Sequence, residues 1–230
     1  LVLDEALRLL EHHLGHLHVA VGGLGRGERV GPCGGNQRED RDNGTSSGGV
    51  SIVDWNELLT ALRREGLLVS ATAEGVDLAG LGIDTRTIGP GQLYCAVRGT
   101  TSDGHGFAAE AVAKGAVAVM GERTMGAGVP EILVTDGRRA ASVAARAWYR
   151  DPAASMTLIG ITGTNGKTTT TGLVRHLFNA KGTAGSIGTL GAFDGAGQPV
   201  PSTAGSLTTP GPVDLHATFA ELRNRGVTHV

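Results

Sequence analysis

The sequence predicts an α/β fold: a small N-terminal α/β domain is followed by the first part of a second, mostly parallel-sheet domain that is truncated. Two observations predict this fold. From residue 51 onwards, apolar runs of strand length alternate with segments of helical periodicity, and Asp151-Pro152 separates two stretches that each show this alternation. Strands that alternate with helices favour parallel pairing, because each helix carries the chain back across a face of the sheet.

The composition argues against several classes of protein. The 230 residues carry a net charge of -2, with 18% charged and 40% hydrophobic residues, so nothing favours nucleic acid or an anionic membrane as a partner. No apolar run approaches the ~20 residues that span a bilayer. The two cysteines, Cys33 and Cys95, stand far apart and form no disulfide or zinc pattern. We therefore expect a cytoplasmic protein without membrane insertion.

The first 50 residues are predicted to be an unassigned, partly disordered extension. Residues 1–20 have leucines at helical spacing, which predicts an amphipathic helix. Residues 22–49 are polar and rich in glycine, which is typical of a disordered linker. Because the chain does not begin with Met, we expect a fragment or an extended translation, and whether residues 1–50 are native stays open.

The expected N-terminal domain spans residues 51–152. Asp54 is a good N-cap for a helix over 55–65, which Gly66 would end. The last helix of the domain stops before Pro152. Between these signals the periodicity predicts a strand at 91–97, a helix at 106–115, strands at 116–120 and 131–136, and a helix at 138–150.

Residues 153–230 repeat this alternation and are expected to form the first part of the second domain. The predicted elements are a strand at 157–161, a helix at 167–180, a short strand at 184–187, a helix at 212–225 and a strand that starts at 227. We expect this domain to be incomplete, because its next strand is cut off at Val230.

The stretch "GITGTNGKTTTT" at 160–171 is the most informative part of the chain. Glycines and a Lys-Thr pair stand between a strand and a helix, where backbone N–H groups and a helix N-terminus converge on a phosphate. Lys167 would reach the β- and γ-phosphates, and the Thr168 hydroxyl would complete a Mg²⁺ shell. The alternative is a Gly/Thr-rich turn with a surface lysine. Five residues separate Gly160 from Gly166, one more than the general pattern has.

The loop and its surroundings resemble the Mur ligase family, the ATP-dependent amide-bond-forming enzymes of peptidoglycan assembly. "TGTNGKTTTT" is similar to the family's ATP loop, which is built around Thr-Gly-Thr-x-Gly-Lys-Thr and accounts for the shifted glycine. "IDTRTIGPGQLYCAVRGTTSDGHGFAAEAVAKGAVAVM" at 83–120 looks like the family's UDP-binding domain, with Thr85 where Ser is usual. "GSIGTLG" followed by "LTTP" resembles the branch that adds the third peptide residue.

The resemblance implies three groups of site residues. Lys167 and Thr168 would serve catalysis directly, and Thr168 would also hold Mg²⁺. The UDP-MurNAc-dipeptide would bind at Ile83, Thr85, Thr100, Thr101, Ser102, Thr208 and Thr209. ATP would bind at Gly163, Thr164, Asn165, Gly166, Lys167, Thr168 and Thr169. Simpler interpretations are an exposed ion pair between Asp84 and Arg86, and a helix cap at Thr208-Thr209-Pro210.

The implied activity is an ATP-dependent ligation that adds meso-diaminopimelate or L-lysine to UDP-MurNAc-L-Ala-D-Glu through an acyl phosphate. ATP, Mg²⁺, the sugar nucleotide and an amino acid would be the partners of a monomer that binds no nucleic acid. The family's metal-binding Glu, carbamylated Lys and amino-acid-binding domain would lie beyond Val230, so the chain alone is expected to be inactive. The alternatives are another Mur or folylpolyglutamate-type ligase, or a non-catalytic nucleotide-binding module.

Overall fold

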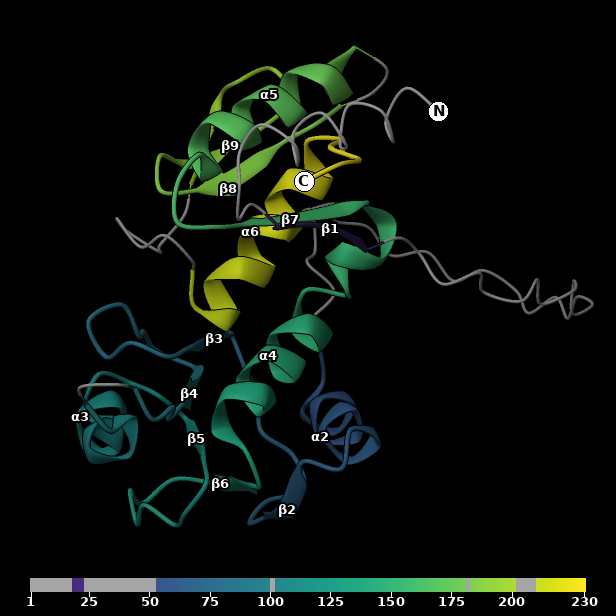
Figure 1. The fold of residues 1–230 in the computed structure, drawn as a ribbon. Helices are drawn as coiled ribbons and strands as arrows, with labels where there is room; N and C mark the ends of the chain where they lie inside the picture. The colour runs from purple at the N-terminus through teal and green to yellow at the C-terminus, as the bar shows by residue number, and fades with distance from the viewer. Residues whose placement is uncertain (1–17, 23–52, 100–101, 181–182, 202–209) are drawn as a thin grey trace, which may run out of the picture.

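The computed structural model describes residues 18–22, 53–99, 102–180, 183–201 and 210–230 (Figure 1). The disordered linker expected at 22–49 lies outside these residues apart from Gly22, and so does most of the helix expected at 1–20. The end of that predicted helix is wrong. His18–Gly22 form strand β1, which pairs antiparallel with a strand of the second half, so hydrogen bonding to a strand edge overrides the helical spacing.

The N-terminal half is built on a five-stranded sheet with the strand order β2-β6-β5-β4-β3. Its strands are β2 Leu68–Ala71, β3 Gly80–Gly82, β4 Gln92–Cys95, β5 Ala118–Gly121 and β6 Glu131–Val134. Four of them run parallel, and β2 pairs antiparallel with β6 at one edge. The mostly parallel pairing predicted from the alternation is confirmed, although β2 and β3 are not among the predicted strands.

Helices cover both faces of this sheet. They are α2 Trp55–Arg64, α3 Ala108–Ala113 and α4 Gly137–Trp148, with a 3₁₀ turn, η1, at Gly104–Phe107. Leu93 and Cys95 of β4 pack in a core with α2 and α4, whereas Tyr94 packs with α3 (Figure 1). This division follows from the two-residue period of strand side chains. The helix predicted at 106–115 begins with the 3₁₀ turn and ends at Ala113.

The second half contains the strand and helix that flank the phosphate loop. Its elements are β7 Leu158–Thr162, α5 Lys167–Asn179, β8 Ser186–Gly188, β9 Gly191–Phe193, β10 Pro199–Val200 and α6 Pro212–Asn224, with a 3₁₀ turn, η2, at Pro152–Ser155. β8, β9 and β10 form an antiparallel sheet. Ile159 N donates to Val230 O at 2.8 Å and Gly185 N donates to His229 O at 2.8 Å. The last residues of the chain therefore pair with β7 on one side and with the segment before β8 on the other. This is the pairing expected of the strand predicted to start at 227.

The two halves are joined by helix packing as well as by the chain. α6 packs against α4, and Val213 of α6 belongs to the buried core of the first sheet. His216 Nε2 in α6 lies 3.4 Å from Ser142 Oγ in α4. Between the halves, Arg150 and Asp151 have φ angles of 57° and 43°, which turn the chain before η2. The end of the first half and α6 thus share a buried interface.

Candidate functional site

The phosphate loop occupies residues 163–166, between the end of β7 and the start of α5. Gly163 has a φ of 151° and Gly166 a φ of 78°, and Gly166 is the residue that caps α5. Both angles lie where a side chain is disfavoured, so glycine at these two positions sets the path of the loop. Gly160 belongs to β7, which explains in structural terms why the spacing departs from the general pattern.

Lys167 places its ammonium group over this loop. It is the first residue of α5, and its Nζ donates to the carbonyl oxygen of Gly163 at 2.6 Å. The first turn of α5 contains no acidic residue. The free N–H groups of a helix start and a lysine together favour an anion, and phosphate is the anion this geometry suits. Thr168 and Thr169 are exposed beside it.

Two cavities meet at this loop. An outer, polar hollow of about 410 Å³ is lined by residues 164–169 together with Thr189. A second cavity of about 570 Å³ lies between the start of α5 and the β8–β9 turn, and it is lined by Lys167, Thr168, Thr189 and Leu190 among others. Volumes in this range suit a small-molecule ligand. Thr189 lines both cavities and is not among the predicted site residues, although "GSIGTLG" was the signal that could have indicated it.

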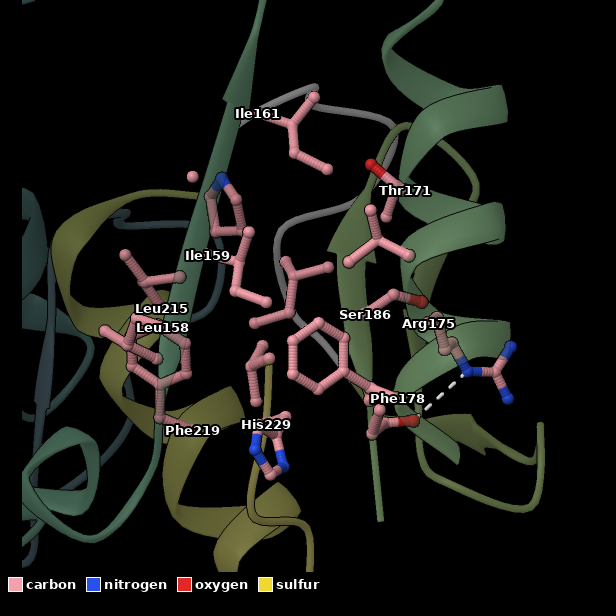
Figure 2. Close-up of a pocket in the computed structure, with 17 residues that line it drawn as sticks. Leu158, Ile159, Ile161, Thr171, Arg175, Phe178, Ser186, Leu215, Phe219 and His229 are labelled. Atoms are coloured by element: carbon pink, nitrogen blue, oxygen red, sulfur yellow. Dashed lines mark hydrogen bonds between the residues drawn. The ribbon is translucent and has the colours of Figure 1, made fainter. Parts of the chain in front are cut away.

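A third cavity, of about 330 Å³, lies between β7, α5, β8 and α6 (Figure 2). Its lining is mostly apolar, and Ile159 and Phe178 point into the same space. Arg175 Nε donates to Ala184 O at 3.3 Å, so this guanidinium is engaged with the backbone (Figure 2). The cavities at the phosphate loop are the better nucleotide site, because Lys167 and the start of α5 line them with groups that suit a phosphate.

The predicted sugar-nucleotide residues of the first half follow the carboxyl ends of parallel strands. Ile83 and Thr85 come directly after β3, and Ser102 lies in the segment after β4. Ligands of open α/β sheets bind at this edge. Thr85 is 9% exposed, and its carbonyl oxygen accepts a hydrogen bond from Lys114 Nζ at 2.7 Å. Hydrogen bonds from Lys114 and, secondly, from the Thr85 hydroxyl lower the pKa of Glu110, so this hydroxyl already has a protein partner.

The simpler interpretation of Asp84 and Arg86, an ion pair, describes their geometry correctly. Arg86 Nη2 lies 2.6 Å from Asp84 Oδ2, and the Arg86 side chain is 85% exposed. The four remaining predicted substrate residues, Thr100, Thr101, Thr208 and Thr209, lie outside the described residues.

The start of α6 approaches the first group of candidates. A Cβ atom placed on Gly211 would come within 2.5 Å of Ile83 Cδ1. Gly211 precedes α6 and directly follows Pro210, the last residue of the "LTTP" stretch. The segment that follows β3 and the segment that leads into α6 are therefore in direct contact, although they belong to different halves of the chain.

A Mg²⁺ ion at the phosphate loop would depend mainly on water and phosphate oxygens. Among the described residues, no group of three or more His, Cys, Asp or Glu side chains could hold a metal. The exposed Thr168 hydroxyl fits a shell of the kind Mg²⁺ prefers when it is bound with a nucleotide. No helix in the described part of the chain is long and apolar enough to cross a membrane.

Two family descriptions match the chain. Residues 77–149 match the catalytic domain of the Mur ligase family, and residues 161–230 match the Mur ligase middle domain. The first match contains most of the parallel sheet, together with Ile83, Thr85 and Ser102. The second contains the whole phosphate loop.

Curated relatives carry the name UDP-N-acetylmuramoyl-L-alanyl-D-glutamate–2,6-diaminopimelate ligase. The protein of Geobacillus thermodenitrificans is 41% identical over 155 residues, which cover 67% of this chain and 31% of that protein. The protein of Agrobacterium fabrum is 42% identical over 156 residues, which cover 67% of this chain and 30% of that protein. The chain thus spans about a third of the length of these relatives.

Solved structures show the same fold. One of a UDP-N-acetylmuramoyl-L-alanyl-D-glutamate–2,6-diaminopimelate ligase matches with a TM-score of 0.51 and 24% identity, covering 66% of this chain and 31% of that one. A MurF structure from Acinetobacter baumannii matches with a TM-score of 0.50 and 20% identity, covering 78% of this chain and 35% of that one.

Proposed function

The chain belongs to the Mur ligase family, and we propose that it supplies the sugar-nucleotide-binding and ATP-binding parts of an enzyme that adds meso-diaminopimelate to UDP-MurNAc-L-Ala-D-Glu. The observation that carries this proposal is the phosphate loop, in which the Lys167 ammonium group and the start of α5 face two ligand-sized cavities. The relatives named as diaminopimelate ligases favour that amino acid over L-lysine.

In the proposed reaction, the γ-phosphoryl group of ATP passes to the free carboxylate of the dipeptide. The amine of the incoming amino acid then attacks the acyl phosphate. This step forms the amide and releases phosphate, so ADP and phosphate are the other two products. Lys167 and the N–H groups of residues 163–169 would hold the phosphates and stabilise the negative charge of the transferred group. Thr168 would hold Mg²⁺, which supplies further charge neutralisation when it is bound.

The sugar nucleotide would bind at the carboxyl edge of the first sheet. Its UDP end would lie on Ile83, Thr85, Thr100, Thr101 and Ser102, and its peptide end near Thr208 and Thr209. The approach of Gly211 to Ile83 supports this assignment, because Gly211 follows Thr209 by only two positions in the sequence and Ile83 directly follows β3. A ligand that reaches across this contact would have its carboxylate held in line with the phosphoryl group.

Two further parts of the proposal concern the state of the protein. The buried Cys95 is a free thiol, which suits the reducing cytoplasm where we propose that the enzyme acts. We also propose that the enzyme is a monomer, with domains 51–152 and 153–230 as its first two functional units. Size-exclusion chromatography with light scattering would measure the mass, and a stable dimer would contradict the monomer.

Calorimetric titration of this chain with Mg²⁺-ADP and, separately, with UDP-MurNAc-L-Ala-D-Glu tests the proposal. We expect both to bind. Lys167→Ala should weaken ADP binding about 10- to 100-fold, because it removes a hydrogen bond to a charged group, and should leave sugar-nucleotide binding unchanged. Lys114→Ala, which removes the bond to the Thr85 carbonyl, should show the opposite pattern.

The result also separates the alternatives. Binding of ADP without the sugar nucleotide would favour a nucleotide-binding module or a folylpolyglutamate-type ligase over the proposed function. For an enzyme that contains this chain, phosphate release with ATP and UDP-MurNAc-L-Ala-D-Glu should depend on meso-diaminopimelate. Equal or faster release with L-lysine would contradict the proposed amino acid.

A further inference from the structure

A fully engaged, buried histidine lies where β4 and β5 end. His105 is 5% exposed, its Nδ1 is 2.6 Å from Asp103 Oδ1, and its Nε2 accepts a hydrogen bond from the backbone N–H of Glu122 at 2.9 Å. A backbone N–H can only donate, so Nε2 carries no proton and Nδ1–H donates to Asp103. The hydrogen-bond network therefore assigns a neutral imidazole with a defined tautomer.

This imidazole joins three segments of the chain. Glu122 follows β5 directly, and its Oε1 accepts a hydrogen bond from Gly137 N, the first residue of α4, at 2.8 Å. Arg123 Nη2 donates to the other oxygen of Asp103 at 2.9 Å. A Cβ atom on Gly121 would come within 2.7 Å of His105 Nε2, so the ring packs directly on the backbone of β5. The segment after β4, the end of β5 and the start of α4 are thus fixed relative to one another.

The same network holds the segment that contains Ser102. Asp103 follows Ser102 directly, and Gly99 N donates to Ser102 O at 2.9 Å. On the other side, Tyr94 Oη donates to Gly104 O at 2.9 Å. The Ser102 side chain is exposed at the carboxyl edge of the sheet, whereas His105 and Tyr94, which hold the residues after it, are buried. A ligand at this edge would therefore meet a surface whose shape depends on His105.

We propose that His105 is a positioning residue for the sugar nucleotide: its neutral imidazole, held between Asp103 and the Glu122 N–H, fixes Ser102 for binding without contacting the ligand. This inference rests on the proposed binding of UDP-MurNAc-L-Ala-D-Glu. The charged groups around the ring are Asp103, Arg123 and the carboxylate of Glu122.

Substitutions of His105 by residues with side-chain amides test its two hydrogen bonds one at a time. His105→Asn keeps a donor near the position of Nδ1 and loses the acceptor for Glu122 N–H, and His105→Gln does the reverse. We expect each to weaken sugar-nucleotide binding about tenfold in calorimetry at neutral pH, the effect of one lost hydrogen bond. Affinity for Mg²⁺-ADP, measured on the same samples, should not change.

Two controls make the result decisive. Ser70→Ala, on the exposed part of β2, should leave both affinities unchanged. If the His105 variants do not fold, Tyr94→Phe removes only the hydroxyl bond to Gly104 O on the other side of the segment, and it should also weaken sugar-nucleotide binding selectively. A folded variant with a lower melting temperature and unchanged affinity would overturn the inference. No sugar-nucleotide binding by the wild-type chain would overturn the proposed function and this inference with it.

Discussion

Gly166 determines whether the phosphate loop can form. Its φ of 78° and its place before α5 mean that any side chain would be strained there. We expect Gly166→Ala to destabilise the chain by about 1 kcal/mol or more and to weaken ADP binding. Gly66→Ala is a matched control far from the loop: its φ of 68° gives a similar strain, a Cβ atom meets nothing within 4 Å, and ADP binding should stay unchanged. Urea unfolding and ADP titration of both variants measure the difference.

Asp103 gives a prediction about acid stability. The hydrogen bond from the His105 side chain is the main cause that lowers the pKa of the Asp103 carboxyl from 3.8 to about 2. A lowered carboxyl pKa means that the stabilisation is complete above the ordinary pKa and is lost as the pH falls towards the folded value. Urea midpoints between pH 5 and pH 2 should therefore fall less steeply in Asp103→Asn than in the wild-type chain. The urea midpoint of Glu74→Gln, a variant that removes an exposed carboxylate elsewhere, should fall as that of the wild type does.

The residues that can be predicted best from the sequence are those whose type alone determines the backbone conformation. Gly163 and Gly166 could be assigned because only glycine tolerates their φ angles, and Lys167 because a lysine at a helix start suits phosphate. Thr189 could not be assigned in this way. Its place in both cavities depends on how the β8–β9 turn folds back over the phosphate loop, a contact between distant residues that no local pattern contains.

Among the elements, α2 and α4 follow the sequence most closely because each starts at an aspartate cap. The Asp54 side chain accepts from Asn56 N, and the Asp136 side chain accepts from Arg139 N at 2.9 Å. The strand predicted to reach residue 136 ends at Val134, because Asp136 belongs to the next helix. β3, β9 and β10, which are not among the predicted strands, contain glycine or proline, and both residues are depleted in strands.

The cap of α4 is open to a direct test. Asp136→Ala leaves one N–H group at the start of α4 without its partner, so the free energy of unfolding should fall by about 1 kcal/mol. Asp136→Ser keeps an acceptor oxygen at the same place and should recover most of this loss. Urea unfolding followed by circular dichroism would show it, and equal losses in both variants would contradict a capping role.

At the scale of the whole molecule, the sequence predicts two halves, but it does not predict the packing of α6 on α4. Alternating strands and helices indicate each half separately, whereas the packing of α6 on α4 depends on the left-handed turn at Arg150 and Asp151. Neither arginine nor aspartate requires positive φ, so this turn is not visible in the sequence.

Val213 tests how strongly the halves depend on each other. It is 5% exposed and lies in the core of the first sheet, so Val213→Asp would bury an unpaired carboxylate at a cost of several kcal/mol. We expect calorimetric unfolding to separate into two transitions, of which only one shifts upwards with ADP. Asn224→Asp, exposed at the end of the same helix, should keep the wild-type profile. A single transition that only moves to lower temperature would contradict this expectation.

The contact between Gly211 and Ile83 has an evolutionary consequence. A side chain at position 211 fits only if the residue at position 83 turns away or becomes smaller, because the Cβ atom would come within 2.5 Å of Ile83 Cδ1. The two positions, far apart in the sequence and in different halves, should therefore change together among related proteins. A glycine at 211 should accompany a large apolar residue at 83, and a larger residue at 211 should accompany alanine or glycine.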